Sequence, residues 1–244
     1  MNACAIIPAL NEEKTITDVV RAVPRKIAPD VIVVDNGSTD ATAERAAAAG
    51  ARVIKESMRG YGRACAVGVQ NLAPDCETVV FLDGDGSDCP ELMNLLVEPI
   101  AEGKYDFVIG SRIRGEREAG SLNFQQIFAG RMAGILMNKL YGVRYTDMCP
   151  FRAIRREALE RLGMREMTYG WNLEMQMRAA RANLRILEIP INHRRRAGGT
   201  SKVSGNVRGT LLAATRIVFT FVRVALERNS IGSAGHDLSA QRRY

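Results

Sequence analysis

The stretch at residues 79–88 reads VVFLDGDGSD and joins four consecutive apolar residues to three carboxylates. A short apolar run of this kind predicts a strand buried on both faces, as found in the parallel sheets of α/β proteins. The carboxylates then follow the C-terminal end of the strand, where open α/β sheets bind ligands. Gly84 and Gly86 let the backbone turn sharply and let a ligand approach closely. The stretch therefore predicts an α/β fold with a binding site at the end of this strand.

The three carboxylates predict a cation site. Asp83, Asp85 and Asp88 would repel one another unless a cation neutralises them, and oxygen ligands suit Mg²⁺ or Mn²⁺. An ion held by few carboxylates completes its shell with water and substrate phosphates. We therefore expect Asp83 and Asp85 to hold a metal ion and a diphosphate. The alternative is a polar loop that caps the next helix, with Asp88 as N-cap and Pro90 in the first turn.

Composition limits the choices without deciding among them. The 244 residues suffice for one large α/β domain or two small ones, and the net charge of +7 allows partners that carry phosphate. We expect no nucleic-acid partner, because aromatic and basic residues are not interleaved. The five cysteines form no C-x-x-C pair, and only two histidines accompany them. Together with an N-terminus unlike a signal peptide, this predicts reduced thiols in a cytoplasmic protein.

Apolar runs and helical patterns alternate along most of the chain. Strands are expected at 3–7, 30–34, 51–54, 78–82, 107–110 and 184–191, and helices at 15–23, before 49, and at 61–71, 91–101, 127–140, 155–162 and 172–183. Short connections in such a β-α alternation imply right-handed crossovers and a parallel sheet. The polar loops at 8–13, 35–40 and 83–88 should then meet at one edge of the sheet. The polar segment 113–127 is expected to be a mobile loop over that edge.

Six motifs in this order resemble those of the family 2 glycosyltransferases, above all their dolichol-phosphate mannose synthase-like group. They are PALNEE (8–13), VVDNGSTD (33–40), DGD (83–85), GSR (110–112), FRA (151–153) and GTSK (199–202). The resemblance covers residues 3–205. It implies a GT-A fold, a single nucleotide-sugar-binding α/β domain with a mainly parallel central sheet flanked by helices. The activity it implies is inverting transfer of a hexose from a UDP- or GDP-sugar to an acceptor, most often a polyprenyl phosphate at the cytosolic face of a membrane.

The resemblance also assigns roles to residues. Near the nucleotide it implies Pro8, Leu10, Asn11, Glu12, Asp35 and Asp83, and on the metal Asp85 with Asp83. Facing the acceptor phosphate it implies Arg112 and Arg131, and closing near the diphosphate or acceptor Arg196, Ser201 and Lys202. Gly62 is also expected near the nucleotide, because it lies in a glycine turn before a helix, where a phosphate can bind. One departure concerns the acceptor. The family commonly has Ser-Gly-Phe where this chain has CPF (149–151), so a hydroxyl that could bind the acceptor phosphate is missing.

Glu174 separates two kinds of acceptor. A phosphate acceptor is already an anion, whereas a hydroxyl acceptor needs a carboxylate base. Glu174 follows the Tyr-Gly-Trp-Asn run at 169–172, the region where relatives with hydroxyl acceptors place such a base. The alternative is a helix-surface ion pair with Arg178, four residues further on. A non-catalytic protein that binds sugar nucleotides is the remaining alternative for the chain as a whole.

The C-terminal part predicts one further helix. Residues 211–226 are mostly apolar but contain Arg216 and Arg223, and the run is shorter than the roughly 20 residues that span a bilayer. An apolar helix with a basic stripe fits an interfacial, peripheral membrane helix. The alternative is a helix packed on its own domain or on a second subunit of a homo-oligomer. We therefore expect a glycosyltransferase domain at 1–205, an amphipathic helix at 206–228 and a disordered tail at 229–244.

Overall fold

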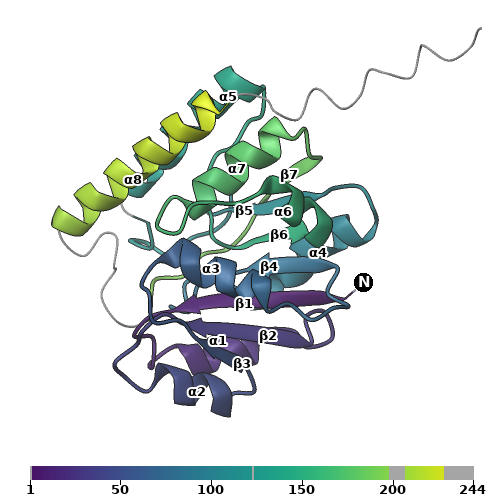
Figure 1. Ribbon diagram of the computed structural model, residues 1–244, viewed down its shortest axis with the longest axis vertical. Coiled ribbons are helices and arrows are strands. Elements are labelled where there is room, and N and C mark those ends of the chain that lie inside the picture. The colour runs from purple at the N-terminus through teal and green to yellow at the C-terminus, as the bar shows by residue number, and fades with distance from the viewer. Residues whose placement is uncertain (1, 123, 198–206, 228–244) are drawn as a thin grey trace, which may run out of the picture.

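Seven strands form one sheet in the order β3-β2-β1-β4-β6-β5-β7 (Figure 1). The strands are β1 (Ala3–Ala9), β2 (Asp30–Asp35), β3 (Arg52–Lys55), β4 (Thr78–Phe81), β5 (Phe107–Ser111), β6 (Arg152–Arg155) and β7 (Ile186–Pro190). The computed structural model describes residues 2–122, 124–197 and 207–227. The four strands β3, β2, β1 and β4 are parallel to one another, and β5 is parallel to β7. The predicted α/β fold with a mainly parallel sheet is confirmed.

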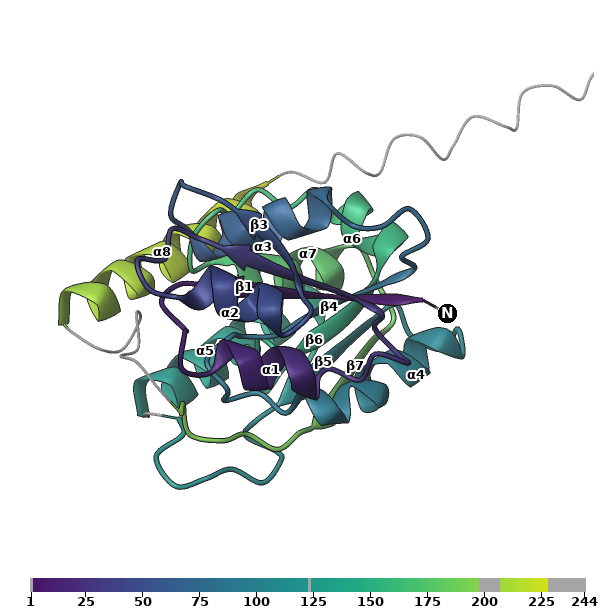
Figure 2. The same ribbon diagram turned by 90° about the horizontal axis from the view of Figure 1, so that it is seen from below.

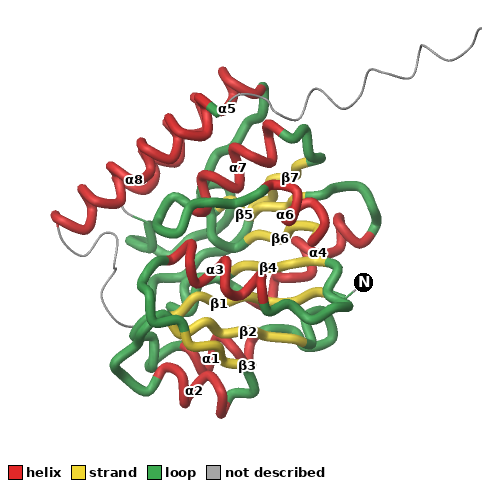
Figure 3. The backbone as a smooth tube through the Cα atoms, in the orientation of Figure 1, coloured by secondary structure: helices red, strands yellow, loops and turns green. Residues whose placement is uncertain are grey.

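Helices cover both faces of this sheet, as the strand and helix colours of Figure 3 and the turned view of Figure 2 show. They are α1 (Ile16–Ala22), α2 (Thr42–Ala48), α3 (Tyr61–Gln70), the 3-10 turn η1 (Pro90–Leu92), α4 (Met93–Ala101), α5 (Phe124–Tyr141), α6 (Arg156–Leu162), α7 (Trp171–Arg181) and α8 (Val207–Leu226). Helices α1 and α4 lie on one face, and α3, α6 and α7 on the other. Each helix overlaps a range expected from the sequence.

The core is built from the apolar runs that predicted the strands. All seven residues of β1 and all four of β4 are buried, as a strand covered by helices on both faces requires. Phe81 at the end of β4 meets the ring of Trp171 edge-on, with 6.2 Å between the ring centroids. The strand that carries the acidic loop is therefore fixed from both sides, and its C-terminal end is well defined.

Strand β6 was not expected from the sequence. It runs antiparallel between β4 and β5, with Val80 opposite Ala153 and Val108 opposite the same residue on the other side. Its first residue, Arg152, is fully buried and donates hydrogen bonds to the carbonyls of Cys149 and Asn172. A charged residue at the centre of the sheet breaks the apolar pattern by which buried strands are recognised.

Helix α8 packs on α7 with an unusual distribution of side chains. Thr220 and Val224 are fully buried against the domain, whereas Val218, Phe219, Val222 and Leu226 on the other side are exposed. Of the alternatives for this helix, packing on its own domain is observed, while contact with a membrane or a second subunit stays a prediction. Within the described ranges, no helix is long and apolar enough to cross a bilayer.

Candidate active site

Three polar loops meet at the C-terminal ends of β1, β2 and β4, as the sequence predicted. The backbone N–H of Asn11 donates to Ser38 Oγ (2.9 Å), and that of Glu12 donates to Thr42 Oγ1 (2.8 Å). Thr15 Oγ1 donates to the carbonyl of Gly84 (2.7 Å), which ties the first loop to the acidic loop. Convergence follows from the parallel order of the three neighbouring strands.

The residues expected around the nucleoside lie together along the first two loops. Asn11 has a left-handed backbone (φ 53°), which asparagine tolerates, and its Oδ1 accepts from the N–H of Thr39 (2.8 Å). Asp35 is buried at the end of β2 and accepts from the N–H of Ser38 (3.1 Å). Pro8 and Leu10 flank the end of β1, and Glu12 is buried beside them. Their contact with a nucleoside stays a prediction.

The acidic loop places its three carboxylates differently from one another. Asp83 accepts a hydrogen bond from Tyr61 Oη (3.0 Å), and its backbone N–H donates to Asp88 Oδ2 (2.9 Å). Asp85 Oδ1 accepts from the N–H and the hydroxyl of Ser87. The expectation that Asp88 caps the following helix is wrong, because Cys89 is the N-cap of η1 and no side chain caps it. Pro90 opens that turn as expected.

Burial disfavours the charged forms of these carboxylates. It combines with the charge of Asp85 to raise the pKa of Asp83 to about 7. Burial, with the charge of Asp83, also raises the pKa of Asp88 well above its usual value. Asp88 Oδ1 and His193 Nδ1, 3.9 Å apart, are both buried and have no hydrogen-bond partner among the described residues. Neighbouring carboxylates, two of them with raised pKa values, offer the oxygen ligands that a hard divalent ion prefers.

Asp83 and Asp85 are the side chains that would hold such an ion together with a diphosphate. Among the residues described, no three histidine, cysteine, aspartate or glutamate side chains already converge closely enough to hold a metal by themselves. A site with few carboxylates is the type that takes its further oxygens from water and phosphate.

Arg112 is fixed beside this cluster by a partner that sequence reasoning missed. Its Nε and Nη2 donate to the two oxygens of Asp147 (2.7 and 2.8 Å), and its backbone N–H also donates to Oδ2 (3.0 Å). The side chain of Asp147 is almost fully buried. Because this bidentate pair uses Nε and one N–H of Nη2, the guanidinium keeps N–H groups on Nη1 and Nη2 for a further acceptor.

The chain after β7 runs back over the acidic loop. Arg194 donates its N–H to the carbonyl of Ser87 (2.9 Å), and Ala197 donates to that of Asp85 (3.4 Å). Arg196 pairs with Glu12 and places Nη1 3.4 Å from Asp85 Oδ2. Arg196 therefore lies beside the acidic loop, and its expected role near the diphosphate or acceptor stays a prediction. Ser201 and Lys202 lie outside the described residues.

Arg131 is not joined to this group by any contact among the described residues. It lies exposed on α5, apart from the ion pairs of the acidic loop. The preceding polar segment is tied to the chain after β7, where Glu118 donates its N–H to the carbonyl of His193 (3.0 Å). The roles of Arg131 in acceptor binding and of this segment as a mobile loop stay predictions.

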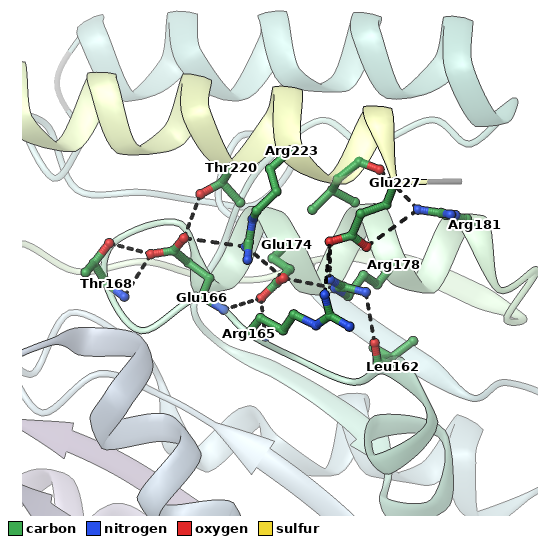
Figure 4. Close-up of polar contacts among 11 residues, drawn as sticks. Leu162, Arg165, Glu166, Thr168, Glu174, Arg178, Arg181, Thr220, Arg223 and Glu227 are labelled. Carbon is green, nitrogen blue, oxygen red and sulfur yellow. Dashed lines mark hydrogen bonds and ion pairs between the residues drawn. The ribbon is translucent and has the colours of Figure 1, made fainter. Parts of the chain in front are cut away.

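Glu174 lies in an ion-pair network between α7 and α8 rather than in the acidic cluster (Figure 4). The residue is fully buried. Its Oε2 accepts from the N–H groups of Arg165 (2.9 Å) and Glu166 (2.6 Å). Its Oε1 accepts from Arg178 and Arg223, both at 2.9 Å. The expected ion pair with Arg178 is confirmed. Because both oxygens are occupied, these contacts do not favour a catalytic base at Glu174.

Gly60 and Gly62 have a packing role that explains why they are glycines. A Cβ on Gly60 would lie 2.2 Å from the carbonyl oxygen of Met167, and one on Gly62 would lie 2.3 Å from that of Glu166. The loop before α7 therefore rests directly on the first turn of α3. The assignment of Gly62 to the nucleotide stays a prediction beside this structural role.

Replacing Gly62 by alanine should lower the free energy of unfolding by about 2 kcal/mol, because the backbone of the loop must move to admit the Cβ. Denaturant unfolding of the purified chain measures this. Gly130→Ala is the matched control, since a Cβ there meets its nearest atoms at 3.7 Å, the distance of an ordinary contact. Equal stability of the two variants would contradict the tight packing.

The sequence did not single out several side chains that organise the site. Only its partner shows the role of each. They are Thr15, Asn36, Tyr61, Asp147 and His193. Asn36 lies within the motif at 33–40 and Thr15 shortly after the motif at 8–13, so a polar side chain at these places was the signal that could have indicated their roles. Asp147 and His193 lie far along the chain from their partners.

A mainly parallel α/β sheet whose acidic loop lies at the strand ends is the GT-A arrangement. Residues 4–163 match the family model described as Glycosyl transferase family 2, and the chain belongs to that family. It is 38% identical over 213 residues to an uncharacterised glycosyltransferase of Mycobacterium tuberculosis, covering 85% of this chain and 92% of the relative. It is 37% identical over 199 residues to a dolichyl-phosphate hexose transferase of Haloferax volcanii, covering 80% and 84%.

A solved structure has the same fold. It is glucosyl-3-phosphoglycerate synthase of Mycobacterium tuberculosis in complex with Mn²⁺, UDP-glucose and phosphoglyceric acid. The TM-score is 0.72 at 22% identity, over 94% of this chain and 81% of that one. At this identity the likeness establishes the fold.

Proposed function

We propose that the protein is an inverting, metal-dependent hexosyltransferase that uses a UDP- or GDP-sugar and a polyprenyl phosphate acceptor. The observation that carries this proposal is the pairing of charges at the strand ends. The carboxylates of Asp83 and Asp85 lie beside the guanidinium of Arg196. The guanidinium of Arg112 is also near, and its positive charge acts to lower the pKa of Asp83. Such a site suits a donor in which negative charge develops on a departing diphosphate.

The leaving group is the part of the reaction that needs most help. Mg²⁺ or Mn²⁺, held by Asp83 and Asp85, would neutralise charge on the diphosphate when bound. Arg196 can move from Asp85 to a phosphate oxygen, because the pair is partly exposed. The relative of known structure binds Mn²⁺ together with UDP-glucose, which supports the same donor half for this chain.

A phosphate acceptor is supported by the position of Glu174. A hydroxyl acceptor needs a base, and the carboxylate proposed for that role is buried with four hydrogen-bond donors. A polyprenyl phosphate is already ionised and attacks without one. The dolichyl-phosphate hexose transferase among the relatives supports this acceptor class.

Two exposed apolar surfaces support work at a lipid surface. On α5, Phe124 is 80% exposed and stacks on Phe128, which is 55% exposed. On α8, Phe219 is 58% and Leu226 is 76% exposed. Exposed apolar side chains gathered on two helices that both pack against α7 mark a contact surface. We assign this surface to peripheral contact with the membrane that contains the acceptor.

Transfer assays on the purified full chain test the proposal. The chain is incubated with Mn²⁺ or Mg²⁺, radiolabelled UDP-glucose or GDP-mannose, and liposomes that contain a polyprenyl phosphate. Liposomes with the corresponding polyprenol are the matched control, because they lack only the phosphate. We expect product from the phosphate alone. Transfer to the polyprenol or to soluble phosphoglycerate would overturn the acceptor, and nucleotide binding without transfer or hydrolysis would overturn the enzyme.

The raised pKa of Asp83 predicts a pH-dependent affinity for metal. A carboxyl with a pKa of about 7 is largely protonated at pH 6 and must release its proton when an ion binds. Mn²⁺ affinity should therefore rise by about fivefold between pH 6 and pH 7, by about tenfold between pH 6 and pH 8, and level off above pH 8. Titration calorimetry with a nucleotide sugar measures it, since the diphosphate diester does not titrate in this range.

The same pKa shift has a definite sign for stability. The proton is bound more tightly in the folded than in the unfolded chain, so the stability that it contributes is full below about pH 4 and is lost as pH rises through 7.

The control for the metal titration is Asp18→Asn, at an exposed position on α1, which should keep the wild-type dependence of Mn²⁺ affinity on pH. If the Mn²⁺ affinity of the wild-type protein did not change with pH, the raised pKa of Asp83 and its place on the metal would be contradicted.

A further inference from the structure

The loop at residues 163–170, between α6 and α7, is held by α8. Glu166 in this loop is buried, and its Oε2 accepts from Thr220 Oγ1 (2.9 Å) and lies 3.6 Å from Arg223 Nη2 (Figure 4). The two donors are on the inner face of α8. The fit is close, because a Cβ on Gly170 would lie 2.4 Å from Thr220 Oγ1. The position of the loop therefore depends on the docked helix.

The same loop holds the first turn of α3. The carbonyl of Thr168 accepts from the N–H of Gly62 (3.1 Å), and that of Met167 accepts from the N–H of Arg63 (2.9 Å). The N-terminal N–H groups of a helix have no partner within it, so acceptors supplied by another segment fix its start. The absence of side chains at Gly60 and Gly62 lets the loop come this close.

The first turn of α3 in turn holds the two halves of the site. Tyr61 donates its hydroxyl to Asp83 Oδ1 (3.0 Å), and Gly60 donates its N–H to Asn36 Oδ1 (2.7 Å) at the end of β2. Asn36 is buried, and its own N–H donates to the carbonyl of Ala9 (2.8 Å) at the end of β1. A shift of this turn would therefore move a predicted metal ligand.

We propose that Glu166 is a positioning residue through which docked α8 sets the Asp83 carboxylate, by way of the first turn of α3 and Tyr61. This inference rests on the proposed function, since it concerns the metal and diphosphate half of that site. Coupling of this kind is reciprocal: a docked α8 favours binding of the metal and nucleotide, and their binding favours the docked helix.

Thr220→Val tests the first contact, because it removes the hydroxyl and keeps the shape. We expect UDP to bind about fivefold more weakly in the presence of Mn²⁺, at the lower end of coupling between sites. Arg223→Met should have a larger effect of the same sign. Arg161→Met is the matched control, since Arg161 is exposed at the end of α6. Unchanged affinity in Thr220→Val would overturn the proposal.

A double-mutant cycle tests the route. Tyr61→Phe removes the contact with Asp83, so adding Thr220→Val to it should weaken UDP binding no further. Additive effects would mean that α8 acts by another path, and would overturn the role of Tyr61. A loss of stability alone cannot give this pattern. The cycle uses the two mildest substitutions, so it stays decisive if Arg223→Met does not fold.

Hydrogen exchange tests the inference apart from catalysis. In Thr220→Val the amides of Gly62 and Arg63 should exchange faster than in the wild-type chain, whereas amides in β1 should not change. Equal exchange would overturn the inference even if the wild-type chain binds UDP. Faster exchange in a chain whose wild-type form binds no nucleotide would overturn the proposed function, and with it the role for Asp83, while leaving the mechanical link.

Discussion

Asp85→Asn should lower the rate of sugar transfer by about a thousandfold at saturating donor, equivalent to about 4 kcal/mol of transition-state stabilisation. An amide keeps the size of the side chain but not its charge, so it weakens the hold on a divalent ion. It also leaves Arg196 without one of its two carboxylate partners. Measurement of product formation over a range of Mn²⁺ concentrations separates lost metal binding from lost turnover.

Asp18→Asn serves as the control for Asp85→Asn. It makes the same chemical change at an exposed position on α1 and should keep full activity. If Asp85→Asn kept more than a tenth of the wild-type rate, a metal at this carboxylate would be excluded as the main source of catalysis. The fold would be unaffected by that result, because Asp85 contacts mainly its own loop and the chain after β7.

Glu174→Gln should lower the free energy of unfolding by about 3 kcal/mol, as expected when one partner of a buried ion pair is removed. The glutamine amide carries an NH₂ group in place of one carboxylate oxygen. In either orientation this group faces other donors, which are the loop N–H groups or the guanidinium groups of Arg178 and Arg223. We expect the turnover number at saturating donor to change less than about threefold, since no proton passes through this side chain. A catalytic base would cost about a hundredfold to ten-thousandfold.

Glu157→Gln is the matched control for stability, because Glu157 is exposed on α6. Denaturant unfolding and transfer assays on the same preparations give both quantities. A large loss of turnover in Glu174→Gln without loss of stability would restore the base role that the sequence suggested. A large loss of stability with near-normal turnover is what the buried network requires.

The sequence was sufficient for the parts of the fold that rest on local pattern. Continuous apolar runs at β1, β2 and β4 are buried because helices cover both faces of the sheet. The polar residues that end these runs then had to meet at one edge. The motifs at 8–13, 33–40 and 83–85 were therefore both structural and functional signals, and the family match over 4–163 agrees with them.

The sequence was insufficient where a residue depends on a distant partner. Arg112 is fixed by Asp147, 35 residues away, and Glu174 by Arg223, 49 residues away. The four-residue spacing along one helix predicted the Glu174–Arg178 pair, but it could not predict that Arg223 of another helix joins them. Arg216 and Arg223 looked like one basic stripe, yet Arg216 is exposed and Arg223 is turned into the network. Charge at a buried position is recognisable only with its partners.

The place of β6 in the sheet has a consequence for synthesis of the chain on the ribosome. Strands β4 and β5 are made early but do not touch, and β6 fills the gap between them only after residues 152–155 emerge. Until then, each of the two strands presents an unpaired edge to other nascent chains. Completion of the sheet also waits for contacts between distant segments, which form slowly. The acidic loop, although translated in the first half of the chain, thus acquires its final support late.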